Sequence, residues 1–162
     1  MTHRPFLRWP DRRLTTPAAP VDTVTDETRA IWAEMVEAMR AMPGVGLAAP
    51  QLGIPQRLAI VDDDGKGVTY LANPRILHAS GQFREHVEAS PNLPGVSAVV
   101  KRPRAVTVAY LDETGTQQET DFVMLRATSV QHQIDHLDGK LYIHRLSKLK
   151  RDMLLKKAAR IV

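Results

Sequence analysis

The sequence predicts a single α+β domain, with short strands between two amphipathic helices and a third helix at the end of the chain. Apolar residues recur at spacings of three and four near residues 26–42 and 122–138, as in helices packed on one face. Short apolar runs between them are separated by turns rich in Gly, Pro and Asp. At 162 residues, 43% hydrophobic and 25% charged, the chain suits one domain, residues 1–162, with a sizeable core.

The elements follow in order along the chain. Four prolines and no clear period in residues 1–22 predict an extended arm. A helix should begin near Thr25 or Asp26, either of which can cap it, and end before residues 43–44. Short, antiparallel strands are expected at residues 58–61, 68–72, 82–89, 97–100 and 106–111. Helical spacing over residues 122–138 and a last helix from about Ser147 complete the set; Val123, Leu125, Val130, Ile134 and Leu137 are the expected core contacts of the former.

Two histidines stand four residues apart in the helix expected at residues 122–138. This spacing places both imidazoles on one face, one turn apart, where they can bind a single metal ion or simply lie on the helix surface. In the H-E-x-x-H pattern a glutamate follows the first histidine and serves as general base. Here His132 is followed by Gln133 and then by His136. An amide can hydrogen-bond a water molecule but cannot take up its proton.

Three segments, residues 44–51, 88–95 and 131–139, together resemble the peptide deformylases, which remove the formyl group from the N-terminal methionine of new bacterial and organellar proteins. The similarity covers nearly the whole chain. It implies the deformylase α+β fold, with short antiparallel strands around a central helix that carries H-x-x-x-H, and a C-terminal helix. The sequence is therefore identified as a divergent member of this family.

The resemblance also implies roles for single residues. Gln51 matches the glutamine whose amide supports the oxyanion, and His132 and His136 match two of three metal ligands. The third ligand is a cysteine in a segment reading E-G-C-L-S-x-P-G, and Ser90 stands in its place. A neutral hydroxyl binds divalent metals far more weakly than a thiolate. Pro91 stands where the family uses a backbone N–H for the oxyanion, and proline has none.

Other matched positions concern the pocket and its support. The resemblance implies that Glu88 and Arg102 form an internal ion pair. Asp135 is expected to steady a neighbouring backbone group or histidine and not to bind metal. If residues 86–90 are extended, His86 and Glu88 share a face with Ser90, which makes both alternative metal ligands. Two polar residues replace apolar ones in the methionine pocket. The implied substrate-binding residues are Val45, Gly46, Leu125, Thr128 and Ser129.

These replacements predict a degenerate hydrolase site with little or no deformylase activity. A general base is worth about a hundred- to ten-thousandfold in rate, and an oxyanion donor about a hundred- to a thousandfold. One divalent ion (Zn, Fe or Ni) is expected at low affinity, or none, and the peptide partner would be a nascent N-terminus. One alternative is an active metal-dependent amide hydrolase in which His132, His136 and a carboxylate or water hold the ion.

A second alternative is a ribosome-associated binding module. Basic residues crowd the end of the chain, where they can meet phosphate or form a solvated helix face. They are Lys148, Lys150, Arg151, Lys156, Lys157 and Arg160. The sequence has no run of apolar residues long enough for a membrane span and no secretory signal, so we expect no membrane partner and a cytoplasmic location. It contains no cysteine, which excludes disulfides and thiolate ligands.

Overall fold

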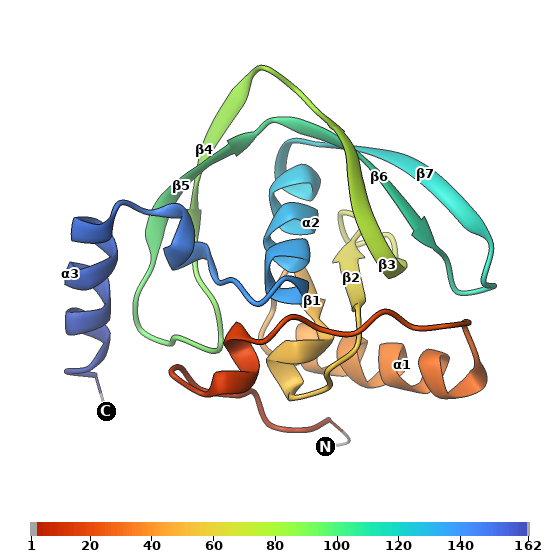
Figure 1. The fold of residues 1–162 in the computed structure, drawn as a ribbon, viewed down its shortest axis with the longest axis horizontal. Coiled ribbons are helices and arrows are strands. Elements are labelled where there is room, and N and C mark those ends of the chain that lie inside the picture. The colour runs from red at the N-terminus through yellow and green to blue at the C-terminus, as the bar shows by residue number, and fades with distance from the viewer. Residues whose placement is uncertain (1–2, 162) are drawn as a thin grey trace.

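The computed structural model describes residues 3–161, which fold around one central helix (Figure 1). Its α-helices are α1 (Asp26–Ala41), α2 (Met124–Leu137) and α3 (Lys148–Ala158). Its strands are β1 (Gly46–Ala48), β2 (Leu58–Asp62), β3 (Val68–Ala79), β4 (Phe83–Glu88), β5 (Ala98–Pro103), β6 (Ala105–Leu111) and β7 (Gln117–Val123). One sheet has the order β1-β2-β3-β6-β7 and the other pairs β4 with β5, and every pairing between these strands is antiparallel. Helix α2 lies between the two sheets (Figure 1).

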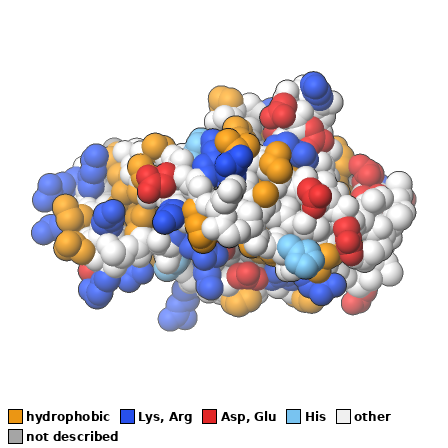
Figure 2. Space-filling model, turned by 90° about the horizontal axis from the view of Figure 1, so that it is seen from above, with side chains coloured by type: hydrophobic (Ala, Val, Ile, Leu, Met, Phe, Trp, Pro, Cys, Tyr) orange, Lys and Arg blue, Asp and Glu red, His pale blue; other side chains and the backbone are white. Residues whose placement is uncertain are grey.

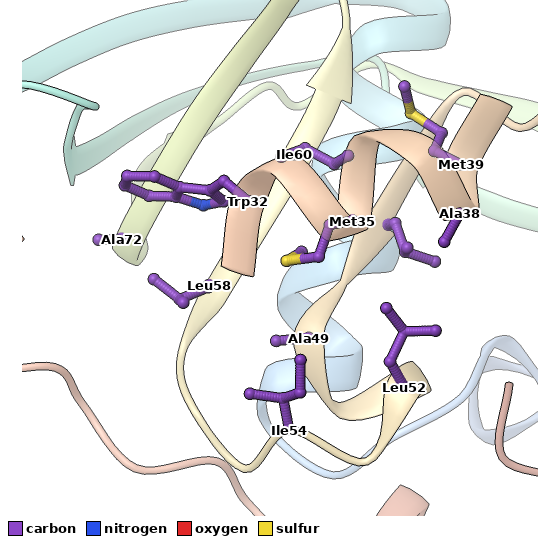
Figure 3. Close-up of a cluster of buried hydrophobic side chains, with 11 residues drawn as sticks. Trp32, Met35, Ala38, Met39, Ala49, Leu52, Ile54, Leu58, Ile60 and Ala72 are labelled. Atoms are coloured by element: carbon purple, nitrogen blue, oxygen red, sulfur yellow. The ribbon is translucent and has the colours of Figure 1, made fainter. Parts of the chain in front are cut away.

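Helix α1 begins at its Thr25 cap, whose side chain accepts from the Thr28 backbone N–H, and packs its apolar face on β1 and β2. Figure 3 shows this cluster, in which Trp32 and Met35 of the helix meet Leu58 and Ile60 of β2. All four side chains are at most 1% exposed. At about 1.5–3 kcal/mol for each large side chain buried, the cluster fixes β1 and the loop after it.

Helix α2 is buried on several sides because it packs against both β1 and β2 and against β7. Ala127, Val130 and Ile134 join the apolar face of the larger sheet. The polar residues of the helix are buried as well, among them Gln131, Gln133 and His136. Polar side chains at such depth need partners, and their partners form the site described below.

Helix α3 is peripheral, and none of its side chains is fully buried. It begins at Ser147, whose hydroxyl accepts from the Lys150 backbone N–H. Its Leu154 and Leu155 pack against the buried cluster that includes Val100 of β5. Leu149 and Met153 face outward and are 70% and 64% exposed. Figure 2 shows apolar and basic side chains side by side at this end of the molecule. None of the helices in residues 3–161 is long and apolar enough to span a membrane.

The expected fold class is confirmed, and most elements lie where they were expected. Residues 3–22 of the predicted arm run largely without regular structure, apart from a 3₁₀ helix at Arg12–Thr15, whereas residues 1–2 lie outside the described part. Strand β7 was missed, because its residues are mostly polar and exposed. Strand β1 was also missed. Val123 was wrongly expected in the core: it ends β7 and is 57% exposed.

Candidate active site

Two histidines of α2 stand at the centre of the site. The Nε2 atoms of His132 and His136 lie 3.2 Å apart. Two histidine nitrogens bound to one tetrahedral zinc at about 2.0–2.1 Å are themselves about 3.3 Å apart. Burial, the neighbouring His132 and the Arg102 guanidinium together hold the pKa of His136 well below its ordinary value, so its ring is neutral at physiological pH. The pair has the spacing of two metal ligands, and His136 is neutral as a metal ligand must be.

A buried carboxylate fixes the orientation of His132. Glu88 Oε1, at the end of β4, lies 2.8 Å from His132 Nδ1, and Arg102 of β5 forms a bidentate pair with Glu88 at 2.7 and 2.9 Å. Burial alone raises the pKa of Glu88, but hydrogen bonds from His132 and Arg102 and their charges lower it to about 2. Glu88 is therefore ionised and holds the Nδ1 side of His132, which directs His132 Nε2 toward His136.

Arg102 also binds a second carboxylate. Its Nη1 lies 2.9 Å from Asp135 Oδ2, and Arg145 contacts the same carboxylate at 2.6 and 3.0 Å. Arg102 and Glu88 are 2% and 5% exposed, so this is a buried ion cluster with two positive and two negative groups. The expected Glu88–Arg102 pair is present, whereas the Asp135 carboxylate binds two arginines and not the expected backbone group or histidine. Glu88 serves His132 and Arg102 and does not turn toward the side of the ring where an ion would sit.

The serine at the third ligand position is part of a hydrogen-bond network centred on Asn92. Ser90 Oγ donates to Asn92 Oδ1 at 3.1 Å and accepts from the Asn92 backbone N–H at 3.2 Å. Gln51 donates to the same Oδ1 at 2.8 Å. Asn92 Nδ2 donates to the backbone oxygens of Leu7 and Gln51. Asn92 has no exposed surface, and Ser90 and Gln51 are 7% and 2% exposed.

These donor sets do not fit a tightly held metal ion. The histidine pair fits, but the third position holds a neutral hydroxyl engaged with Asn92, which is a poor ligand for divalent metals. His136 Nδ1 is buried without a partner, whereas a metal-bound histidine normally donates from its second nitrogen. Within residues 3–161 no three histidine or acidic side chains come close enough to hold an ion. His86 and Glu88 therefore do not replace the thiolate as ligands.

Gln133 occupies the general-base position and presents an unpartnered acceptor. Ser129 Oγ donates to the Val45 backbone oxygen at 2.9 Å, so toward Gln133 it can only accept. The Gln133 Nε2 group, 3.5 Å away, therefore faces Ser129, and the Gln133 Oε1 atom is buried without a partner. Gln133 lines the cavity described next and is 4% exposed. A buried acceptor of this kind needs an N–H or O–H donor from a bound molecule or water.

A cavity of about 440 Å³ opens beside these groups. Every residue expected to bind substrate lies on its wall, together with Gln51, Ser90, Gln133 and His132. The two polar replacements in the wall are internally satisfied, because Thr128 donates to the Met124 oxygen and Ser129 to the Val45 oxygen. The wall therefore offers no free hydroxyl donor, and an apolar ligand side chain can lie against it. His136 and Arg102 stand behind the wall and support it.

Sequence reasoning missed several residues of the site. Asn92 stands at the serine of the family segment E-G-C-L-S-x-P-G and was given no role, although it joins Ser90 to Gln51. Arg84 of β4, which donates to Thr128 at 3.0 Å, was missed as well. His86 was expected only as an alternative metal ligand, and it lines the cavity with an unpartnered Nδ1. Tyr142 stacks on His132, with ring centroids 6.1 Å apart. Burial and the nearby Glu88 charge raise the pKa of Tyr142 to about 12. Only Asn92 had a signal in the sequence, namely its departure from the family segment.

Gly46 has no Cβ, and its neighbours leave no space for one. A Cβ at this position would lie 2.8 Å from Gln133 Nε2 and 2.9 Å from the Ile60 backbone oxygen, and would also collide with Ser129 Oγ. We expect Gly46→Ala to push β1 away from β2, with a loss of about 1–3 kcal/mol in urea denaturation and a disturbed cavity wall. Gly81→Ala is the control, because a Cβ there meets nothing within 4 Å. Equal stability of both variants would contradict this packing.

Comparison with known proteins agrees with the fold. A profile of the polypeptide deformylase family matches residues 3–152. A peptide deformylase-like protein of Bradyrhizobium diazoefficiens is 46% identical over 97% of this chain and 93% of its own length. A peptide deformylase of Rhizobium meliloti is 38% identical over 97% and 92%. The crystal structure of a Legionella pneumophila peptide deformylase superimposes with a TM-score of 0.92 at 37% identity, over 98% of this chain and 95% of that one. This chain, with its retained histidine pair and cavity, belongs to the peptide deformylase family.

Proposed function

We propose that this protein binds the amino terminus of formylated peptides in the deformylase cavity and has little or no deformylase activity. The observation that carries the proposal is a cavity in a deformylase fold whose reactive positions hold neutral side chains. Gln133 cannot accept a proton, Ser90 is engaged with Asn92, and Pro91 has no N–H to offer an oxyanion. A divalent ion, if it binds at all, would be held weakly by His132 and His136.

The hydrogen-bonding groups of the cavity favour a blocked amino terminus. Gln133 Oε1 needs a donor, and the N–H of a formylated amine is a neutral donor. A free ammonium group would also donate, but its charge would need a carboxylate. The buried acids near the cavity, Glu88 and Asp135, are already paired with Arg102 and Arg145. Burying an unpaired ammonium costs several kcal/mol, so the formylated peptide should bind more tightly.

Turnover and binding of formyl-Met-Ala-Ser test the proposal directly. We expect kcat/KM at least about ten-thousandfold below that of the Rhizobium meliloti enzyme, because the base and an oxyanion donor are both replaced. Calorimetry should show binding of the formylated peptide at least about tenfold tighter than that of the free-amine peptide. Rapid turnover by protein loaded with zinc, iron(II) or nickel, and free of host deformylase, would overturn the proposal in favour of an active hydrolase with altered ligands.

A second candidate function, compatible with the first, is attachment to the ribosome through α3. Residues 147–161 carry six basic side chains and one acid, and the outward face of α3 exposes Leu149 and Met153. A helix that contributes little to the core can present such a face to phosphate without loss of fold.

Co-sedimentation with ribosomes at increasing salt tests this candidate. Lys156→Glu with Lys157→Glu should weaken binding and reduce the slope of log affinity against log salt by about 2. Lys66→Glu with Lys101→Glu, outside α3, controls for the change in net charge. If the two double variants sediment alike, α3 is not the contact.

A further inference from the structure

We infer that Asn92 adapts the third ligand position of this site to a neutral hydroxyl group and, independently of Ser90, keeps an anionic ligand out. The inference rests on the proposed function and deepens it. It assigns the poor fit of this site to a metal ion to two residues, Ser90 and Asn92, each of which has its own effect.

The donors and acceptors around Asn92 have fixed directions. Its Nδ2 faces two backbone oxygens, those of Leu7 at 2.6 Å and Gln51 at 3.1 Å, so this atom must be the nitrogen. The Gln51 amide is oriented in the same way, because its Oε1 accepts from the Ala48 backbone N–H at 2.9 Å. The Asn92 Oδ1 atom must therefore face Ser90 Oγ and Gln51 Nε2, and it accepts from both.

This arrangement suits a hydroxyl and opposes a thiolate. The Ser90 side chain has a proton to give to Asn92 Oδ1 and a lone pair to receive the Asn92 backbone N–H. A thiolate sulfur at the same position could still accept the hydrogen bond of the Asn92 backbone N–H. It would also face Asn92 Oδ1, the negative end of the amide dipole, and has no proton to donate to that oxygen. Both groups are buried, with Ser90 at 7% and Asn92 at 0% exposed, so water screens this repulsion poorly. The charged form is therefore disfavoured.

The same amide ties the oxyanion glutamine to the N-terminal arm. One N–H of Gln51 is committed to Asn92, and the Asn92 backbone oxygen accepts from the Trp9 N–H at 2.8 Å. Leu7 N–H in turn donates to the Gln51 oxygen at 2.9 Å. Asn92 is thus a positioning residue that holds the Ser90 loop, Gln51 and the arm together without an ion.

Zinc retention by an introduced thiol tests the inference. The chain has no cysteine, so Ser90→Cys adds a single thiol at this position. We expect Ser90→Cys to bind zinc at least about tenfold more weakly than Ser90→Cys/Asn92→Ser. After dialysis against zinc and then buffer, the double variant should retain close to one zinc per chain and the single variant far less.

A matched control separates this effect from general loosening. The side chain of Asn73 in β3 forms two hydrogen bonds with the Val21 backbone and does not contact Ser90. The control variant Ser90→Cys/Asn73→Ser should therefore behave like Ser90→Cys. If Ser90→Cys/Asn92→Ser unfolds, Ser90→Cys/Asn92→Ala replaces it in the comparison with Ser90→Cys. The rise in melting temperature on adding zinc, measured against a sample with chelator, then reports zinc binding in each variant. Equal zinc retention with Asn92 present or replaced would overturn the inference. That outcome leaves the proposed function intact, because the proposed function is judged by turnover of the unmodified protein.

Discussion

Arg102→Met is expected to lower the free energy of unfolding by about 3–5 kcal/mol, because it leaves two buried carboxylates without their shared cation. Arg102 is 2% exposed and contacts both Glu88 and Asp135 at 2.7–2.9 Å. Arg145 still pairs with Asp135, but its side chain is half exposed. Within residues 3–161, Arg145 forms no ion pair with Glu88. Urea denaturation of the variant and the unmodified protein measures the loss.

Two further variants show whether charge is the cause. Arg4→Met removes a surface pair with Glu34 and should cost no more than about 1 kcal/mol. Glu88→Gln combined with Arg102→Met removes both charges of the closest pair and should recover part of the stability lost by Arg102→Met alone. A double variant that is less stable than the sum of the two single effects would mean that packing of the guanidinium stem, and not its charge, holds the cluster.

The sequence predicted those parts of the fold that local rules determine. Thr25 caps α1 as expected, α3 begins at the expected Ser147, and the apolar period located both amphipathic helices. Strand β3 continues beyond the expected residue 72 to Ala79, past an irregularity in its pairing with β6 at Asn73 and Pro74. Strand β7 has no apolar alternation, because it lies at the edge of its sheet with most side chains in solvent. Only its pairing with β6 reveals it.

The site was predictable in its residue types but not in its connections. Spacing placed His132 and His136 together, and the family segments placed Gln51, Ser90 and Gln133 near them. Hydrogen bonds between residues far apart in the chain, such as Leu7 with Asn92 or Arg84 with Thr128, leave no periodic trace in the sequence. The unpartnered Oε1 of Gln133 also depends on such a bond, because the Ser129 hydroxyl donates to the Val45 backbone oxygen and therefore cannot donate to Gln133.

Restoring the lost groups is expected to create deformylase activity in stages. In saturating zinc, which offsets the weak metal affinity expected while Asn92 is present, Gln133→Glu with Ser90→Cys should raise kcat/KM by about a hundredfold or more over the unmodified protein. A general base alone is worth about a hundred- to ten-thousandfold. The new carboxylate would be buried at a position where Ser129 offers no proton, and burial raises its pKa toward the range of an effective base. Either change alone should give far less, because groups that act as a unit are not additive.

Pro91 should limit this repair. Without a backbone N–H at residue 91, the oxyanion would have only Gln51 as a protein donor, and one missing donor costs about a hundred- to a thousandfold. Adding Pro91→Leu to the double variant should recover much of that factor in kcat with little change in KM, because the N–H acts on the charge that develops during reaction. Steady-state kinetics with formyl-Met-Ala-Ser measure each step. Pro94→Leu serves as control, because Pro94 belongs to the same loop but does not line the cavity. A triple variant no faster than the double variant would show that the chain at residue 91 does not direct its N–H toward the reacting carbonyl.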